Sequence, residues 1–315
     1  MARPEDSTPT PVLIGGTGRC GTTVMGGLLG SHTAVRVSLP REVKFLTEPA
    51  GLVDLCVSDD RGTRLLAQAW QRQAARVPGI RTRFVFAQFE ESMRGRWWQR
   101  RNRQGRESGL QLTMNVVDRE KALVGLKQRL RAGNRLQAGR NFFEEIVRAQ
   151  YGHGSESFWV DTSPPNVVRA PELTQLLPNA KFIWMVRDGR STAASVLSER
   201  WGPNTPDAAI TWWARRLARC HNGVTKLPSE SFLLIRLEDL VVREREVTFS
   251  RILNFLDLPD DTTMRTFFAE RMPATRLRLD AWRGRVSDPE SFERCYIEAR
   301  DQLLDQGFDP YESPS

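Results

Sequence analysis

The feature that most constrains this 315-residue sequence is an apolar run that leads directly into a glycine-rich stretch, within residues 11–23. The apolar residues 12–14 are typical of a buried strand, and three of the next four residues are glycine. Glycine accepts backbone angles that other residues avoid, and it leaves room for a ligand against the main chain. A helical pattern of apolar residues begins after Gly21. Strand, glycine loop and helix in this order predict a phosphate site, in which N–H groups at the start of the helix hold the anion.

The loop differs from that of the nucleotide hydrolases at one decisive position. Residues 16–23 fit the spacing G-x-x-x-x-G-x-[ST], but the hydrolase loop requires lysine where Thr22 stands. That lysine neutralises a triphosphate, whereas the cation of this loop, Arg19, stands three places earlier. The sequence therefore favours a smaller anion, such as one phosphate with a short extension. A glycine-rich turn without function is the alternative, and the position of Arg19 weighs against it.

The sequence Gly-Arg-Cys-Gly-Thr-Thr at residues 18–23 resembles the 5′-phosphosulfate loop of sulfotransferases that use 3′-phosphoadenylyl sulfate (PAPS). The family's usual loop has serine or threonine at the position of Cys20. This departure is harmless if the residue contributes only its backbone N–H, and it weakens phosphate binding if the family's hydroxyl is needed. The resemblance implies that PAPS is bound by Gly18, Arg19, Cys20, Gly21, Thr22 and Thr23.

A second segment resembles the same family. Residues 180–186 form an apolar strand that runs into Arg187, and Ser195 follows eight residues later, two turns into the next predicted helix. A cation at the end of a strand and a hydroxyl on the following helix can converge on one phosphate. The segment is similar to the one that binds the 3′-phosphate in sulfotransferases, especially in the tyrosylprotein branch. By the same resemblance, a basic C-terminal loop that covers the cofactor makes Arg283 and Arg285 further candidates.

Glu42 is the candidate general base. Glycan sulfotransferases carry a glutamate base in a similar segment after the phosphosulfate loop, and Lys44 stands where that segment has histidine. An acceptor hydroxyl must lose its proton as it attacks sulfur, and a positioned carboxylate can accept that proton. The resemblance implies that Arg19 and Lys44 assist catalysis, with Glu48 as the alternative base. Thr162 departs from the family, which often has lysine there.

The region 51–151 is the part of the chain least similar to the family. Its apolar spacing predicts helices, including segments at 52–55, 65–70 and 123–130, and we expect it to bind the acceptor. Residues 94–106 contain six arginines around two tryptophans. Such a pattern can bind a single-stranded nucleic acid or another polyanion. We favour a solvated amphipathic helix whose tryptophans face the core.

The composition of the sequence limits its partners, its metal or disulfide sites and its cell compartment. The formal net charge of +8 suits anionic ligands, but it also permits nucleic acid or an acidic membrane surface as a partner. The four cysteines show no C-x-x-C spacing, so neither a zinc site nor a disulfide framework is expected. No apolar run approaches the length of a membrane span, and the polar N-terminus does not resemble a signal peptide. These features favour the cytoplasm.

Alternating strands and helices predict a three-layer α/β/α fold with a central parallel sheet, and the resemblance makes it a P-loop-type sulfotransferase fold. We expect one domain over residues 11–308, with 51–151 as a mainly helical insert and with tails at 1–10 and 309–315.

The function expected from the resemblance is transfer of a sulfuryl group from PAPS to a hydroxyl of a small molecule, glycan, lipid or peptide. No metal, nucleic acid or membrane span is expected, and the oligomeric state is left open. Two alternatives come from other classes of protein. One is a P-loop small-molecule kinase, and the other is a polyanion-binding protein built around residues 94–106.

Overall fold

The computed structural model describes residues 8–57, 80–101, 105–151 and 156–309. The helix predicted at 65–70 and most of the predicted tails lie outside these residues. The chain divides into two compact units. Unit 1 comprises Met1–Pro11, Arg36–Ser163 and Pro171–Ala180, and unit 2 comprises Val12–Val35, Pro164–Ala170 and Lys181–Ser315.

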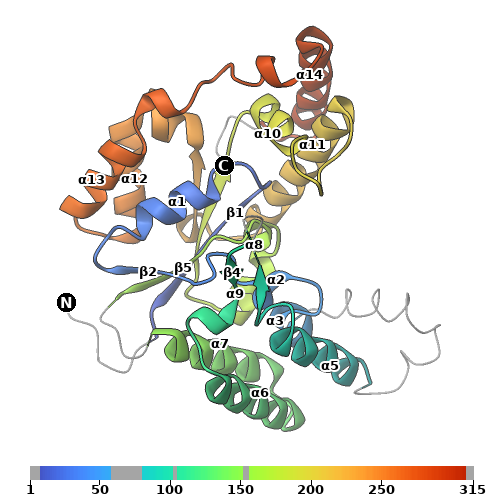
Figure 1. The fold of residues 1–315 in the computed structure, drawn as a ribbon, viewed down its shortest axis with the longest axis vertical. Coiled ribbons are helices and arrows are strands. Elements are labelled where there is room, and N and C mark those ends of the chain that lie inside the picture. The colour runs from blue at the N-terminus through green and yellow to red at the C-terminus, as the bar shows by residue number, and fades with distance from the viewer. Residues whose placement is uncertain (1–7, 58–79, 102–104, 152–155, 310–315) are drawn as a thin grey trace. The chain divides into compact units, whose positions relative to one another are not determined.

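The sheet confirms the strands predicted from the apolar runs. Five strands are ordered β2-β5-β1-β6-β7 (Figure 1). Within unit 2, β1 pairs parallel with β6, and Gly16 stands opposite Met185. Because parallel strands end at the same edge of a sheet, the residues that follow β1 and β6 are neighbours. The strands are β1 (Thr10–Gly16), β2 (Val35–Val37), β5 (Phe158–Asp161), β6 (Lys181–Val186) and β7 (Phe232–Arg236).

Helices flank the strands of unit 2. Figure 1 shows α1, α12 and α13 on one side of β1, and α10, α11 and α14 on the other. Large side chains such as Trp184 and Trp213 are fully buried between the strands and α11. This arrangement confirms the predicted α/β fold class. The helices are α1 (Thr22–Leu29), α8 (Pro165–Val168), α10 (Gly189–Val196), α11 (Pro206–Val224), α12 (Arg245–Leu256), α13 (Thr262–Arg271) and α14 (Pro289–Asp305).

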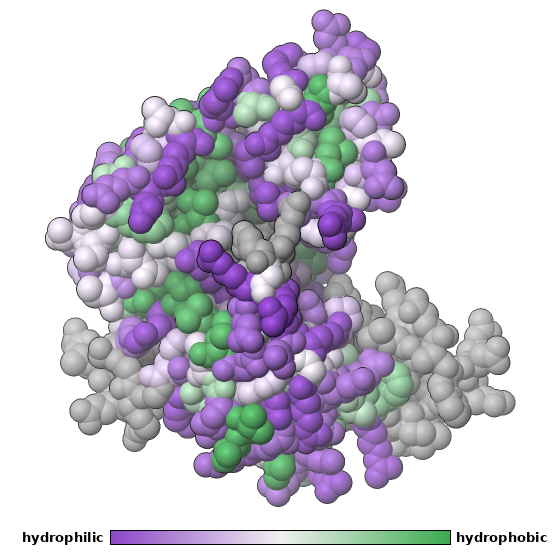
Figure 2. Space-filling view, viewed as in Figure 1, coloured by the Kyte–Doolittle hydropathy of each residue, from purple (hydrophilic) through white to green (hydrophobic). Residues whose placement is uncertain are grey.

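Unit 1 is mainly helical. Phe45, Phe89 and Phe142 meet edge to face in its core, with ring centroids 6.1 Å and 5.3 Å apart. Hydrophilic side chains cover most of the surface over α6 and α7 in the view of Figure 2. The elements are α2 (Lys44–Thr47), α3 (Leu52–Cys56), α5 (Ile80–Arg94), the two-stranded β3 (Arg100–Arg101) and β4 (Glu107–Ser108), α6 (Val116–Arg131), α7 (Arg135–Tyr151) and most of α9 (Ala170–Leu176).

The prediction of a helix over residues 94–106 is wrong. Helix α5 ends at Arg94, and the chain then turns into the short antiparallel pair β3–β4. The return strand leads to Gly109 at φ 118°, where a Cβ would lie 2.3 Å from the Trp98 carbonyl oxygen. Such a close approach requires glycine, so this conformation depends on Gly109. The prediction that both tryptophans face the core is confirmed, since Trp97 and Trp98 are 3% and 9% exposed.

Candidate functional site

The loop between β1 and α1 has the backbone geometry of an anion site. Gly18 and Gly21 have φ values of 86° and 101°, and Arg19 has a φ of 60°, which is uncommon for a residue with a side chain. The first turn of α1 contains no acidic residue. Its N–H groups therefore give the start of the helix a positive character that favours an anion at Gly21, Thr22 and Thr23.

Cys20 turns its side chain into the protein. The residue is fully buried, and burial raises the pKa of its thiol. Its sulfur occupies the space beside Gly16, where a Cβ would come within 2.6 Å of Sγ and 2.5 Å of the Met185 carbonyl oxygen. Position 20 can therefore offer a ligand only its backbone N–H, which answers the question raised by the absence of serine or threonine.

Arg187, Ser195 and Arg19 come together in unit 2. Arg187 follows β6 and donates from one terminal nitrogen to the Arg19 carbonyl oxygen (3.2 Å). Arg19 donates from Nε to the Oγ of Ser195 on α10 (3.1 Å). The Nε of Arg187 is buried and has no hydrogen-bond partner. A buried donor without a partner is costly, and an anion at this point would satisfy it.

The two C-terminal arginines differ in their surroundings. Arg285 lies near enough to Arg187 for its charge to contribute to lowering the pKa of that guanidinium, although burial is the main cause. Arg283 donates to Glu293 (2.7 Å), and its guanidinium lies over the Trp282 ring (4.5 Å to the centroid). Of the two candidates, Arg285 is therefore the one that adds positive potential to the cluster around Arg187.

Two polar side chains of this cluster were not predicted. Arg216 on α11 donates to the Thr17 carbonyl oxygen (3.0 Å). The same guanidinium nitrogen would lie 3.9 Å from a Cβ at Gly18, so Arg216 packs against the loop. Glu199 approaches Arg19, with 3.5 Å between its Oε1 and a terminal nitrogen of the guanidinium. Glu199 stands four residues after Ser195 but beyond the end of α10 at Val196, in a turn that helical spacing does not predict.

In unit 1, Lys44 lies between the two candidate bases. Its Nζ is 2.9 Å from Glu42 Oε2 and 3.6 Å from Glu48 Oε1. Glu48 also accepts a hydrogen bond from Trp97 Nε1 (2.8 Å), and Arg96 approaches its second oxygen (3.9 Å). Glu42 has the more exposed side chain, at 36% against 28%. Of the two carboxylates, Glu42 is the less constrained by the contacts described.

The chain around Glu42 is held by Asp161, the last residue of β5, and by Thr162, which follows it. Val43 donates its N–H to Asp161 (2.8 Å), and the fully buried Thr162 donates from its N–H and hydroxyl to the Arg41 carbonyl oxygen (2.9 and 3.0 Å). Thr162, which stands where the family often has lysine, therefore fixes the backbone next to Glu42.

His32 is used for structure in unit 2. Its ring nitrogens meet the Pro259 carbonyl oxygen (3.1 Å) and the Ala34 N–H (3.0 Å). Both nitrogens are thus occupied by backbone groups, which makes His32 a poor candidate for a base.

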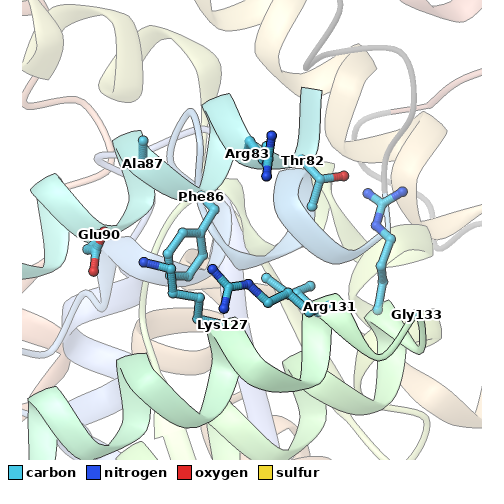
Figure 3. A pocket seen from close by; sticks show the side chains of 10 residues that line it. Thr82, Arg83, Phe86, Ala87, Glu90, Lys127, Arg131 and Gly133 are labelled. Atoms are coloured by element: carbon cyan, nitrogen blue, oxygen red, sulfur yellow. The ribbon is translucent and has the colours of Figure 1, made fainter. Parts of the chain in front are cut away.

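A pocket of about 520 Å³ lies in unit 1 between α5, the C-terminal end of α6 and the start of α7. Figure 3 shows Phe86 beside Lys127, whose Nζ is 5.6 Å from the ring centroid. No carboxylate partner is found for Arg83, Lys127 or Arg131 among the residues the structure describes. The pocket therefore suits a ligand with an apolar body and a negative charge. Its lining includes Arg83, Phe86, Glu90, Lys127, Leu130 and Arg131, and the Glu90 carboxylate lies 3.1 Å from Arg94.

Two of the described arginines of residues 94–106 have partners within the protein. Arg94 binds Glu120 (2.6 Å), and Arg96 lies over the Trp97 ring (5.2 Å to the centroid). Because both tryptophans are buried, they offer no face for stacking with a base. These contacts weigh against the polyanion-binding alternative.

The described part of the chain contains neither a cluster of metal-binding side chains nor a membrane-spanning helix. No group of three or more His, Cys, Asp or Glu side chains is placed to hold a metal ion. None of the described helices combines the length and the apolar character needed to cross a bilayer.

The fold and this loop are those of one protein family. Residues 11–262 match the model of the family described as "Sulfotransferase family". The chain therefore belongs to the sulfotransferase family, and the resemblance drawn from the two motifs is confirmed.

Two curated relatives to which the chain is similar are protein-tyrosine sulfotransferases. Protein-tyrosine sulfotransferase A of Caenorhabditis elegans is 29% identical over 122 residues, which cover 37% of this chain and 32% of that protein. Protein-tyrosine sulfotransferase of Drosophila melanogaster is 24% identical over 164 residues, which cover 44% and 32%. The matched region thus spans about a third of the length of either relative.

A solved structure shows the fold. The sulfotransferase domain of the Synechococcus PCC 7002 olefin synthase superposes with a TM-score of 0.52 at 16% identity, covering 99% of this chain and 98% of that domain. The chain has the α/β sulfotransferase fold.

Proposed function

We propose that this protein transfers a sulfuryl group from PAPS to a hydroxyl of its acceptor. The observation that carries the proposal is the buried, unpartnered Nε of Arg187, beside Ser195 and the loop that follows β1. Two anion sites at neighbouring strand ends suit a nucleotide with phosphate groups at both the 3′ and 5′ positions.

The residues present fit the two ends of this nucleotide. Arg187 and Ser195 would hold the 3′-phosphate, and Arg285 would add positive potential there. Gly18, Cys20, Gly21, Thr22 and Thr23 would hold the 5′-phosphosulfate mainly through backbone N–H groups, as expected from the φ values of the loop. The bound donor supplies the sulfuryl group, and Arg19 would stabilise negative charge on the oxygen that leaves sulfur.

We assign the role of general base to Glu42. A carboxylate accepts the hydroxyl proton only while the proton is leaving, because free carboxylic acids have a pKa of about 4. Lys44, whose Nζ is 2.9 Å from Glu42 Oε2, orients that carboxylate. Glu48 is the weaker candidate, since Lys44, Trp97 and Arg96 surround it.

The acceptor is proposed to be a tyrosine hydroxyl of a protein or peptide. The names of the two relatives support this class. Unit 1 supplies a pocket whose cations, Arg83, Lys127 and Arg131, have no carboxylate partner among the described residues. Acidic residues next to the acceptor tyrosine would suit these charges.

The test is a transfer assay with PAPS and a pair of tyrosine peptides, one flanked by acidic residues and one by neutral residues. Mass spectrometry should show added SO₃ on the peptides, with faster modification of the acidic one. Transfer to neither peptide, together with transfer to a glycan or small-molecule phenol in the same assay, would overturn the acceptor class. Failure of adenosine 3′,5′-bisphosphate to bind would overturn the donor.

A further inference from the structure

A buried carboxylate, that of Glu238, lies beside the end of the strand that leads to Arg187. Strands β6 and β7 are parallel, and their last residues, Val186 and Arg236, stand opposite each other. Residues 188 and 238, two positions further along each chain segment, are therefore neighbours. Glu238 is 7% exposed, and its Oε1 accepts a hydrogen bond from the Asp188 N–H (2.9 Å). Glu238 thus ties the chain after β6 to the chain after β7.

Asp188 connects this hydrogen bond to helix α10. It is the N-cap residue of α10, and its side chain accepts a hydrogen bond from the Ser191 N–H (2.9 Å). Its carbonyl oxygen accepts another from the Thr192 N–H (2.9 Å). Ser195 follows seven residues after Asp188, and about two helical turns bring it back to the same side of α10. The place of the Ser195 hydroxyl therefore depends on the place of Asp188.

The same hydrogen bond restricts Arg187. The Asp188 N–H and the Arg187 carbonyl group belong to one planar peptide unit. Fixing this N–H therefore also fixes the backbone from which the Arg187 side chain extends. That side chain donates to the Arg19 carbonyl oxygen (3.2 Å), and its buried Nε has no partner. Glu238 thus acts on both groups that are assigned to the 3′-phosphate.

The charge of Glu238 explains less than its hydrogen bond does. Burial lowers the pKa of the Arg187 guanidinium, the charges of Glu238 and Asp188 raise it, and the charge of Arg285 lowers it. A guanidinium keeps its proton in proteins in spite of such neighbours. Within the described residues no ion pair joins Arg187 to Glu238. The contribution of Glu238 to the site is therefore geometric.

We propose that Glu238 is a positioning residue for the nucleotide. Its hydrogen bond to the Asp188 N–H sets Arg187 and Ser195 at the spacing that a 3′-phosphate requires, and it thereby favours nucleotides that carry this group. Glu238 acts through Asp188 and does not itself contact the nucleotide. This inference rests on the proposed function, because it takes Arg187 and Ser195 to be the 3′-phosphate site.

The test is isothermal titration of the full chain with adenosine 3′,5′-bisphosphate and with 5′-AMP, and the quantity compared is the ratio of the two affinities. Glu238→Gln removes the charge but keeps an oxygen that can accept from the Asp188 N–H, so the ratio should stay within about twofold of the wild type. Glu238→Asp keeps the charge but shortens the side chain by one methylene. Its ratio should fall by about tenfold, because a hydrogen bond weakens steeply when its geometry is lost.

Two further variants separate positioning from stability and from net charge. Glu238→Ala removes the acceptor, and its ratio should fall at least as far as that of Glu238→Asp. Glu244→Gln makes the same change in net charge as Glu238→Gln at an exposed position six residues further along the chain, and its ratio should match the wild type. The Gln and Asp variants decide the question even if Glu238→Ala fails to fold.

Three results would overturn the role of Glu238. A lower ratio in Glu238→Gln with an unchanged ratio in Glu238→Asp would show that the charge matters and the hydrogen bond does not. Lower stability of Glu238→Asp or Glu238→Ala in urea, with an unchanged ratio, would show a purely structural residue. An equal fall in Glu244→Gln and Glu238→Asp would show an effect without relation to this hydrogen bond.

The inference and the proposed function fail in different ways. Each of the three results above assumes that the wild type binds the bisphosphate, so each leaves the proposed donor site intact. No bisphosphate binding by the wild type, with the protein folded by circular dichroism, would overturn both proposals.

Discussion

Arg187→Ala gives the most direct test of the nucleotide site. In the ligand-free protein the substitution removes one described hydrogen bond, from Arg187 to the Arg19 carbonyl oxygen, and it also removes a buried Nε that has no partner. The two effects on folding oppose each other, because a lost hydrogen bond destabilises and a lost unsatisfied donor stabilises. We expect the free energy of unfolding to change by about 1 kcal/mol or less, which corresponds to a Tm shift of about 2–4 °C at most.

Binding should respond much more strongly than folding. A charge-assisted hydrogen bond to a phosphate is worth about 1.5–3 kcal/mol. Its loss should therefore weaken the binding of adenosine 3′,5′-bisphosphate by about 10-fold to 150-fold. 5′-AMP lacks the 3′-phosphate, so its affinity should change by less than about threefold on the same reasoning.

Isothermal titration with both nucleotides measures this difference. Arg278→Ala is the matched control, since it removes one arginine at an exposed position whose side chain has no hydrogen bond or ion pair among the described residues. Equal losses of affinity for the two nucleotides in Arg187→Ala would refute the assignment of Arg187 to the 3′-phosphate. So would an equal loss in Arg278→Ala.

Three other predictions test separate parts of the site and its loop. Glu42→Gln should lower turnover by about two to four orders of magnitude with little change in nucleotide affinity, and Glu48→Gln should have a milder effect; initial rates at saturating PAPS and acceptor decide this. Arg285→Ala should weaken bisphosphate binding more than Arg283→Ala, because Arg283 is paired with Glu293; titration calorimetry compares them. Gly16→Ala should destabilise the fold by about 3 kcal/mol in urea unfolding, since a Cβ there would lie 2.5 Å from a backbone oxygen.

Each of these has a result that counts against it. Near-normal turnover in Glu42→Gln would move the role of base to Glu48. A larger loss in Arg283→Ala than in Arg285→Ala would show that the contact of Arg283 with Glu293 breaks when nucleotide binds. Gly284→Ala is the control for the loop glycine, because nothing lies within 4 Å of a Cβ at that position. Equal stability of the two alanine variants would contradict the packing argument.

The fold of unit 2 could be predicted because its signals are local. Apolar runs at 12–14 and 180–186 became β1 and β6, and Ser195 lies on α10 as its spacing after Arg187 predicted. Each of these signals depends only on a few consecutive residues. That Arg187 and the β1–α1 loop are neighbours then follows from the pairing of β1 with β6.

Residues 94–106 show where sequence reasoning failed. Their arginines and tryptophans suggested one face of a helix, but the chain turns after Arg94 and returns as β4. The turn depends on Gly109 approaching the Trp98 carbonyl oxygen, which no periodicity reveals. The carboxylate partner of Arg94, Glu120, also lies on another helix, and its pairing could not be read from the sequence.

Within the site, residue types were easier to predict than their orientations. The sequence indicated that Cys20 belongs to the loop, but burial of its thiol behind Gly16 depends on packing. Lys44 was expected near Glu42, and its simultaneous approach to Glu48 was not. Glu199 was missed because a carboxylate is not sought in an anion site and because it lies beyond the end of α10, where helical spacing does not apply.

The burial of Cys20 makes this cysteine an internal reporter of loop opening. A thiol reagent can reach its sulfur only when the β1–α1 loop separates from the body of unit 2, so the alkylation rate measures the population of the open loop. Cys295 is less buried and provides a reference within the same chain. A nucleotide that closes the loop should slow alkylation of Cys20 and leave the rate at Cys295 unchanged, so the protein can report its own ligand occupancy without an added label.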